Sequence, residues 1–226
     1  MKTRPMLFSD AMVRAILYGR KTQTRRVIKQ PIPTNVRGFE RYINPLGNVA
    51  FGWVLGDSKK YGTLLELANM RCPYGQPGDR IWVRECHYVI GETNEVFYRA
   101  SGGLSQYAER DRLQNNPPLI WQGPWRPSIF MKRAWSRIAL EITNVRVERL
   151  QDISNADAIA EGIERNPEYP ALWKSGNLHG DQNTMKSTGF PKLAYRSIWE
   201  QINGHESWVA NPWVWVIEFK RVDNSQ

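Results

Sequence analysis

The chain has 226 residues and a mass of 26.2 kDa, and its 31 lysines and arginines against 22 aspartates and glutamates give a net charge of +9. Hydrophobic residues make up 41% of the sequence, a composition that excludes a disordered chain and a collagen-like repeat. The longest apolar run, Trp213 to Ile217, is far shorter than the roughly 20 residues of a membrane-spanning helix, so we expect a cytoplasmic protein without a membrane partner.

The first predicted helix covers residues 10–18. Ser9 is suited to cap its N-terminus, and Gly19 is suited to end it. Residues 1–30 hold eight lysines and arginines but a single acidic residue, Asp10, so most of the net charge is concentrated there. A concentrated cationic patch attracts phosphate groups, which favours a nucleic acid or a nucleotide as the partner. The alternative is a solvated basic surface without a partner.

Strand patterns follow at residues 80–89, 95–100, 137–150 and 213–221. In the third segment Asn144 interrupts the alternation, which predicts a bulge or a bend. In the last segment both alternating sets of side chains are apolar, so we expect that strand to lie centrally in its sheet.

Two further helices are predicted in the second half of the chain. Ser154 and Asp157 have capping-box spacing at the start of a helix over residues 154–161. The other begins at Pro191, a residue that the first helical position accepts, and ends at Asn203. The acidic stretch 152–164 is interpreted as a solvated helix face.

Strands mixed with a few helices, without regular alternation, indicate an α+β or barrel architecture. Residues 30–72, 101–130 and 163–190 lack clear periodicity, and we interpret them as insertions or long loops within a single domain that spans residues 1–226. Loops of such length often cover or build a site.

The densest polar cluster is the segment from Gly19 to Arg26. A lysine that is crowded by arginines and partly desolvated has a lowered pKa, so Lys21 is a candidate base. A neutral amine is able to take the proton of a hydroxyl group, which makes Thr24, three residues later, the candidate nucleophile. The alternative for Lys21 is a phosphate contact.

Glu85 is the candidate catalytic carboxylate. It shares a strand face with Ile81 and Val83, and an apolar setting raises the pKa of a carboxyl group toward the range useful for acid–base catalysis. The alternative is a structural ion pair with Lys21 or with an arginine. Cys72 and Cys86 have no nearby partner at metal-ligand spacing, so we expect no disulfide, no metal and no cofactor.

Three motifs together carry a family resemblance. They are Gly19-x-Lys21-x-x-Thr24-x-Arg26, the turn Pro77-Gly78-Asp79 leading into Trp82-Val83-Arg84-Glu85, and the terminal Asn211-Pro212-Trp213-Val214-Trp215-Val216. In this order they resemble ASCH-domain proteins, which have a PUA-like fold. The resemblance covers most of the chain and is strongest to the longer, phage- or prophage-associated members.

The resemblance implies a mixed β-barrel of five or six strands flanked by short helices. Some small ASCH proteins are amidohydrolases that remove the acetyl group of N4-acetylcytidine with a lysine, a threonine and a glutamate, roles that transfer to Lys21, Thr24 and Glu85. The substrate class is then a modified cytidine nucleoside, nucleotide or RNA. This chain is about twice as long as those hydrolases, and Arg25 makes its loop more cationic, which favours a phosphorylated substrate or an RNA strand over a free nucleoside.

A non-catalytic RNA-binding module is the second hypothesis, with single-stranded RNA as partner and no obligate protein partner. Its phosphate and base contacts are predicted at a set of cationic and aromatic residues: Arg20, Lys21, Arg25, Arg26, Trp82 and Arg84, with Trp121, Trp125 or Trp135 as further stacking surfaces. A ribonuclease is the third hypothesis, for which only His87, His179 and His205 are available as acid–base histidines.

Overall fold

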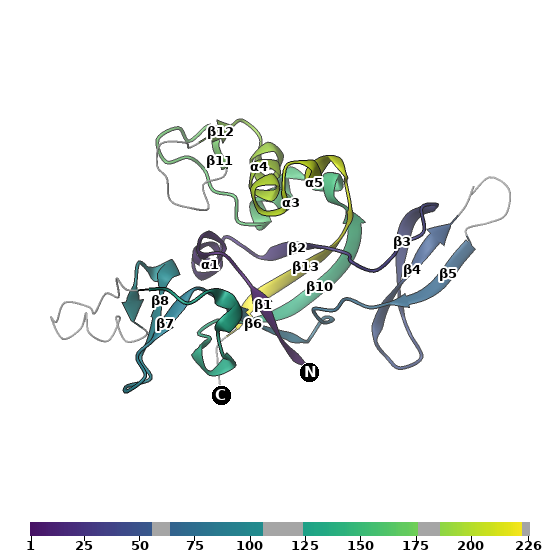
Figure 1. The fold of residues 1–226 in the computed structure, drawn as a ribbon. Coiled ribbons are helices and arrows are strands. Elements are labelled where there is room, and N and C mark those ends of the chain that lie inside the picture. The colour runs from purple at the N-terminus through teal and green to yellow at the C-terminus, as the bar shows by residue number, and fades with distance from the viewer. Residues whose placement is uncertain (56–63, 106–123, 176–185, 223–226) are drawn as a thin grey trace.

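The centre of the structure is a mixed five-stranded sheet with the strand order β1-β6-β10-β13-β2 (Figure 1). The computed structural model describes residues 1–55, 64–105, 124–175 and 186–222. The sheet strands are β1 Thr3–Leu7, β2 Gln23–Val27, β6 Arg80–Arg84, β10 Ala139–Arg149 and β13 Trp213–Val222. β1 runs parallel to β6, and the other neighbours are antiparallel. The fold is therefore α+β, and within the described residues the sheet keeps two edges, β1 and β2, without a closed barrel.

Strand β13 is covered on both faces, as its sequence predicts. Trp215 and Ile217 belong to a core shared with α1 and β6, whereas Val214 and Val216 belong to a second core beneath the helices of the C-terminal half. Burial on both faces explains why the first half of this strand, Trp213 to Ile217, is entirely apolar. The strand is flanked by β10 and β2, so its predicted central place is confirmed.

Two local features of the strands bear on the predictions. The register of β10 against β13 shifts between Ile142 and Asn144, which confirms the predicted irregularity at Asn144. The predicted strand 80–89 is divided, because β6 ends at Arg84 and the separate strand β7 covers His87–Val89. β7 pairs with β8, Val96–Tyr98, in another sheet, so Glu85 lies in the break between two sheets.

The predicted helices are confirmed with their caps. They are α1 Asp10–Leu17, α3 Asn155–Ala160 and α4 Pro191–Asn203, followed by the short α5 Glu206–Val209. Ser9 Oγ accepts a hydrogen bond from the backbone of Met12, and the capping box of Ser154 and Asp157 is present in both directions. In the described part of the chain, no helix combines the length and the apolar character needed to cross a bilayer.

The three predicted insertions contain more regular structure than we expected. Residues 30–72 form an antiparallel sheet of three strands, β3 Val36–Ile43, β4 Val49–Leu55 and β5 Leu64–Met70, which stands to one side of the central sheet (Figure 1). β9 Leu104–Ser105 pairs with β8 and is the third strand of the sheet that β7 and β8 form. β11 Trp173–Ser175 pairs with β12 Lys186–Thr188. The described 3-10 turns are Arg99–Ser101, Ser128–Phe130, Arg133–Trp135 and Leu150–Asp152.

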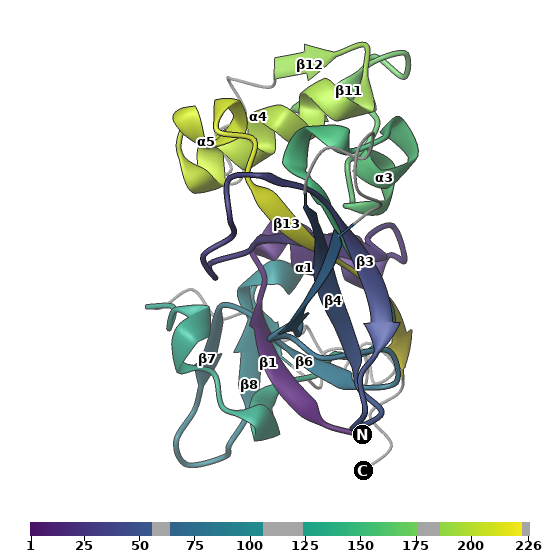
Figure 2. The same cartoon turned by 90° about the vertical axis from the view of Figure 1, so that its right-hand side faces the viewer.

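The helices gather at one end of the central sheet. Both views place α3, α4 and α5, with the paired strands β11 and β12, on the same side, above the start of β13, and Figure 1 shows β2 beneath α3 (Figures 1 and 2). Apolar residues of these helices, among them Ala158, Ala194, Tyr195 and Trp199, pack in the second core. Edge strand β2 is thereby placed beside the end of α3.

Candidate functional site

The segment between α1 and β2 is fixed by backbone hydrogen bonds. The backbone N–H groups of Arg20 and Lys21 both donate to Ala15 O, at 2.8 and 3.0 Å. Lys21 then forms an isolated antiparallel bridge with Glu161, the residue that follows α3. The cationic loop is therefore held against the end of α3.

Lys21 is buried against a carboxylate. Its Nζ donates to Glu161 Oε2 at 2.7 Å and to Glu161 O at 2.8 Å, and both side chains are almost completely buried. Gln23, on the same side of the chain, donates through Nε2 to Asp157 O at 3.0 Å. The acidic stretch 152–164, which we interpreted as a solvated helix face, in fact supplies partners for this loop, because α3 packs directly over it.

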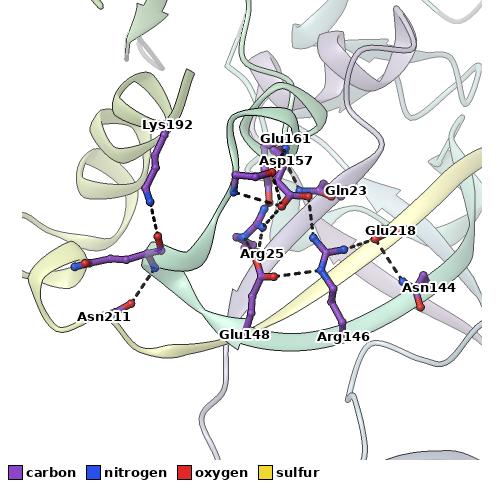
Figure 3. A network of polar contacts seen from close by, with 12 residues as sticks. Gln23, Arg25, Asn144, Arg146, Glu148, Asp157, Glu161, Lys192, Asn211 and Glu218 are labelled. Atoms are coloured by element: carbon purple, nitrogen blue, oxygen red, sulfur yellow. Dashed lines mark hydrogen bonds and ion pairs between the residues drawn. The ribbon is translucent and has the colours of Figure 1, made fainter. Parts of the chain in front are cut away.

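Arg25 is the centre of an ion-pair network (Figure 3). Its fully buried guanidinium contacts Glu161 Oε1 at 3.2 Å, Asp157 Oδ2 at 3.4 Å and the carboxylate of Glu148. Arg146 contacts Glu148 and Asp157 as well, and it also pairs with Glu218. The donors of Arg25, which we predicted to contact phosphate, are thus engaged by carboxylates within the protein.

Glu161 therefore serves two buried cations at once. Burial lowers the pKa of Lys21, an effect that the nearby charges of Arg26 and Arg25 reinforce and that Glu161 opposes. The predicted direction of this shift is the one found, but burial contributes more than the arginines do. Arg20 takes no part in it, because its guanidinium turns away to Glu164, 2.8 Å distant.

A cavity of about 250 Å³ lies along β2. Its polar lining includes Thr24, Arg25, Arg26, Lys29, Glu161 and Asn203, and its apolar and aromatic lining includes Tyr74, Tyr195, Ile198, Trp199 and Ile202. Ile198 and Ile202 lie four residues apart on α4 and therefore share one face of the helix. The cavity thus combines a buried charge pair with flat aromatic surfaces.

The edge of β2 adds backbone groups to this cavity. Ile28 N donates to Trp213 O at 3.0 Å and Phe219 N donates to Thr22 O at 2.8 Å, so the even-numbered residues of β2 direct their backbone groups toward β13. The backbone groups of Gln23, Arg25 and Val27 face the other edge, where no strand in the described ranges pairs with them. Such an edge offers donors and acceptors to a ligand.

Two of the three predicted catalytic residues lie at this site. Thr24 is 2% exposed and lines the cavity, and Lys21 lies directly behind Glu161. Glu85 does not join them. Its carboxylate, 1% exposed, accepts two hydrogen bonds of 2.9 Å from Nε and Nη2 of Arg137.

Sheet order explains the position of Glu85. It follows β6, and β10 and β13 separate β6 from β2. Burial raises the pKa of Glu85 as expected, although the ion pair with Arg137 opposes this shift. The structural alternative, an ion pair with an arginine, is therefore the one found. The carboxylate beside Lys21 is Glu161, which we did not predict.

One signal in the sequence points to Glu161. Glu161 is the last residue of the predicted helix and Glu164 lies three residues beyond it, at the end where the helix dipole disfavours negative charge. A carboxylate there is stable when cations from elsewhere pair with it. The pairing partners, Lys21 and Arg25, are about 140 residues away in the sequence, with separations of 140 and 136.

The remaining predicted contact residues are dispersed. Arg26 lines the cavity and donates to Leu7 O at 2.6 Å. Trp82 and Arg84 stack on each other on β6, with 5.3 Å from the guanidinium carbon to the ring centroid, and neither lines the cavity.

The aromatic and histidine candidates also lie apart from β2. Trp135 packs in a small core near β8 and Trp125 is half-buried, while Trp121 and His179 lie outside the described residues. His87 is fully buried, which lowers its pKa, and His205 is exposed.

Gly162 provides a test of how tightly Lys21 is packed. At Gly162 the backbone φ is +96°, and an added Cβ would lie 2.9 Å from Ala15 Cβ and 3.1 Å from Lys21 Cβ. We expect Gly162→Ala to cost about 1–2 kcal/mol of backbone strain and about 1–3 kcal/mol of overpacking. Gly204→Ala is the matched control, because its φ is +91° and nothing lies within 4 Å of the added Cβ. If urea denaturation showed that both variants lose the same free energy of unfolding, the tight packing of Gly162 against Lys21 would be contradicted.

The chain matches no protein-family model, no curated protein and no solved structure. Within the described ranges, no three His, Cys, Asp or Glu side chains gather in a way that would hold a metal ion.

Proposed function

We propose that the protein is an amidohydrolase of the ASCH type, with a PUA-like fold, and that it removes the acyl group of an N4-acylated cytosine bound in the cavity beside β2. Thr24 is the nucleophile, and Lys21 and Glu161 form the acid–base pair, with Glu161 in the role that we first assigned to Glu85. The observation that carries the proposal is the sharing of Glu161 between the buried Lys21 and Arg25 at the wall of the cavity that Thr24 lines.

The proposed proton path runs through the pair of Lys21 and Glu161. Arg25 contacts Oε1 of Glu161 and Lys21 Nζ contacts Oε2, and burial lowers the pKa of Lys21, which favours the neutral amine that a base requires. Thr24 Oγ attacks the acyl carbon, and its proton passes through Glu161 to Lys21 Nζ. The pair returns this proton to N4 as the C–N bond breaks, and water then hydrolyses the threonine ester.

Recognition of the base rests on the walls of the cavity. Tyr74, Tyr195 and Trp199 offer flat surfaces to an aromatic ring. Arg25 and Val27, which both line the cavity, direct backbone N–H and C=O groups away from β13, where they are able to bond the edge of a base. A cavity of about 250 Å³ is slightly smaller than the roughly 300–1,000 Å³ of drug-sized ligand pockets, which suits a single nucleoside.

Incubation with N4-acetylcytidine tests the proposal. The wild-type protein is expected to release cytidine and acetate, and Thr24→Ala is expected to lose at least about a hundredfold in kcat, because the attacking oxygen is absent. Thr22→Ala is the matched control, since Thr22 lies two residues earlier and is exposed. Separation of the nucleosides by liquid chromatography measures the turnover.

Two outcomes count against this function. Full turnover by Thr24→Ala would remove the nucleophile. Absence of turnover by the wild-type protein, on the free nucleoside and on acetylated RNA alike, would reject the hydrolase. If RNA then still bound with a steep dependence on salt, the RNA-binding module would be the better hypothesis.

A further inference from the structure

A second cavity of about 380 Å³ lies at the other side of the turn that precedes β6. Its walls come from three parts of the chain: residues 1–4, the β3–β4 connection at Asn48 and Val49, and the turn from Arg71 to Asp79. The insertion 30–72 thus provides one wall. The two cavities are neighbours, since Tyr74 lines the first, whereas Pro73 and Gly75, each about 3.8 Å away along the Cα trace, line the second.

The second cavity is cationic. Lys2, Arg4 and Arg71 line it, and Asp79 is the one acidic residue in its wall. The carboxylate of Asp79 is already satisfied, since it accepts hydrogen bonds from Lys2 N at 2.7 Å, from Arg4 Nη1 at 3.2 Å and from Gln76 N at 3.3 Å. Among the described residues no carboxylate pairs with the side chains of Lys2 and Arg71, both of which are exposed.

The turn is shaped to hold Arg4 in place. Gly75 has a φ of +130°, and an added Cβ would lie 2.8 Å from Ile142 Cδ1 and 3.3 Å from Arg4 Nη1. Only a residue without a side chain permits this close approach. Asp79 accepts a hydrogen bond from the same guanidinium, so Arg4 is a preorganised cation in a wall that also holds the exposed Lys2 and Arg71.

We propose that this second cavity binds a phosphate group. Two unpaired cations and one held by Asp79 surround a concave space, the arrangement in which charge-assisted hydrogen bonds to an oxyanion are strong. The phosphate belongs either to a free phosphate or phosphomonoester, or to the backbone of a polynucleotide whose next residue reaches the first cavity. The proposal does not depend on hydrolysis by Thr24.

The experiment compares two charge-matched double variants. Lys2→Ala/Arg71→Ala removes the two exposed cations of the cavity, and Lys132→Ala/Arg133→Ala removes one exposed lysine and one exposed arginine outside its wall. Calorimetry with inorganic phosphate is expected to show at least about tenfold weaker binding for the first double variant and unchanged binding for the second. Single-stranded RNA is the second probe, titrated over a series of salt concentrations.

The two probes identify the source of the phosphate. If the backbone of RNA occupies the cavity, the first double variant lowers the slope of log K against log salt by about 1.4, which is about 0.7 for each lost contact with a single strand. A loss for inorganic phosphate alone supports a free phosphate or a phosphomonoester. Affinities of the first double variant that equal those of wild type for both probes, or no binding of either probe by wild type, would overturn the proposal.

Discussion

Glu161→Gln is expected to lower turnover of N4-acetylcytidine by at least about a hundredfold and the free energy of unfolding by about 3–5 kcal/mol. The substitution leaves Lys21 and Arg25, both fully buried, without the carboxylate that they share. A buried cation without its partner is costly, because the interior solvates it poorly. Turnover and urea denaturation measure the two effects, with circular dichroism confirming that the assayed variant is folded.

Glu164→Gln is the matched control. This carboxylate lies three residues later and pairs with Arg20, but its side chain is 48% exposed and does not line the cavity. An exposed ion pair contributes less than about 1 kcal/mol, so stability and turnover are expected to stay near those of wild type. Equal effects of the two substitutions would mean that the position of Glu161 between two cations has no special role.

Lys21→Met is expected to abolish turnover and to remove its rise with pH. In wild type, kcat/KM is expected to rise with pH as Lys21 loses its proton, at a pH below the ordinary lysine value of 10.5, because burial lowers the pKa. Lys21→Arg keeps the charge but offers no proton to release, so it is expected to be inactive at every pH. A profile of kcat/KM between neutral and alkaline pH provides the measurement.

The same group makes stability depend on pH. With its pKa lowered by folding, Lys21 binds fewer protons in the folded protein than in the unfolded chain at pH values just below 10.5. The free energy of unfolding therefore increases as pH rises toward 10.5, and this contribution is absent in Lys21→Met. A variant that keeps the slope, or that keeps the pH profile of turnover, would show that Lys21 is not the titrating group.

Much of the fold could be predicted from local patterns. Ser9 and the Ser154–Asp157 pair indicate where two helices begin, because a capping side chain bonds backbone groups within three residues of its own position. The two apolar faces of β13 indicate that the strand is buried on both sides, and Asn144 indicates the irregular register of β10 against β13. Strands β3, β4 and β5 were missed because their sequences lack a regular alternation of apolar and polar residues.

The candidate site was predictable in part. Lys21 and Thr24 belong to one short segment; Thr24 lines a cavity, and Lys21 contacts Glu161, which lines the same cavity. The choice of Glu85 rested on its apolar neighbours, which correctly indicated burial and a raised pKa but not the partner, Arg137. An apolar setting is a local property, whereas the identity of a salt-bridge partner depends on which strands become neighbours.

By itself the sequence determined where helices begin and end, which strand lies in the middle of the sheet, and that an unusual concentration of cations follows the first helix. Only the tertiary structure decided what those cations face. The packing of α3 over the start of β2 brings Glu161 to Lys21 and Arg25 across about 140 residues, with separations of 140 and 136. Hydrogen-bonded caps and alternating burial act over a few residues and leave a trace in the local pattern. Ion pairs between distant segments depend on which elements become neighbours, so the local pattern marks at most a charge in need of a partner, such as Glu161 at a helix end, and does not identify that partner.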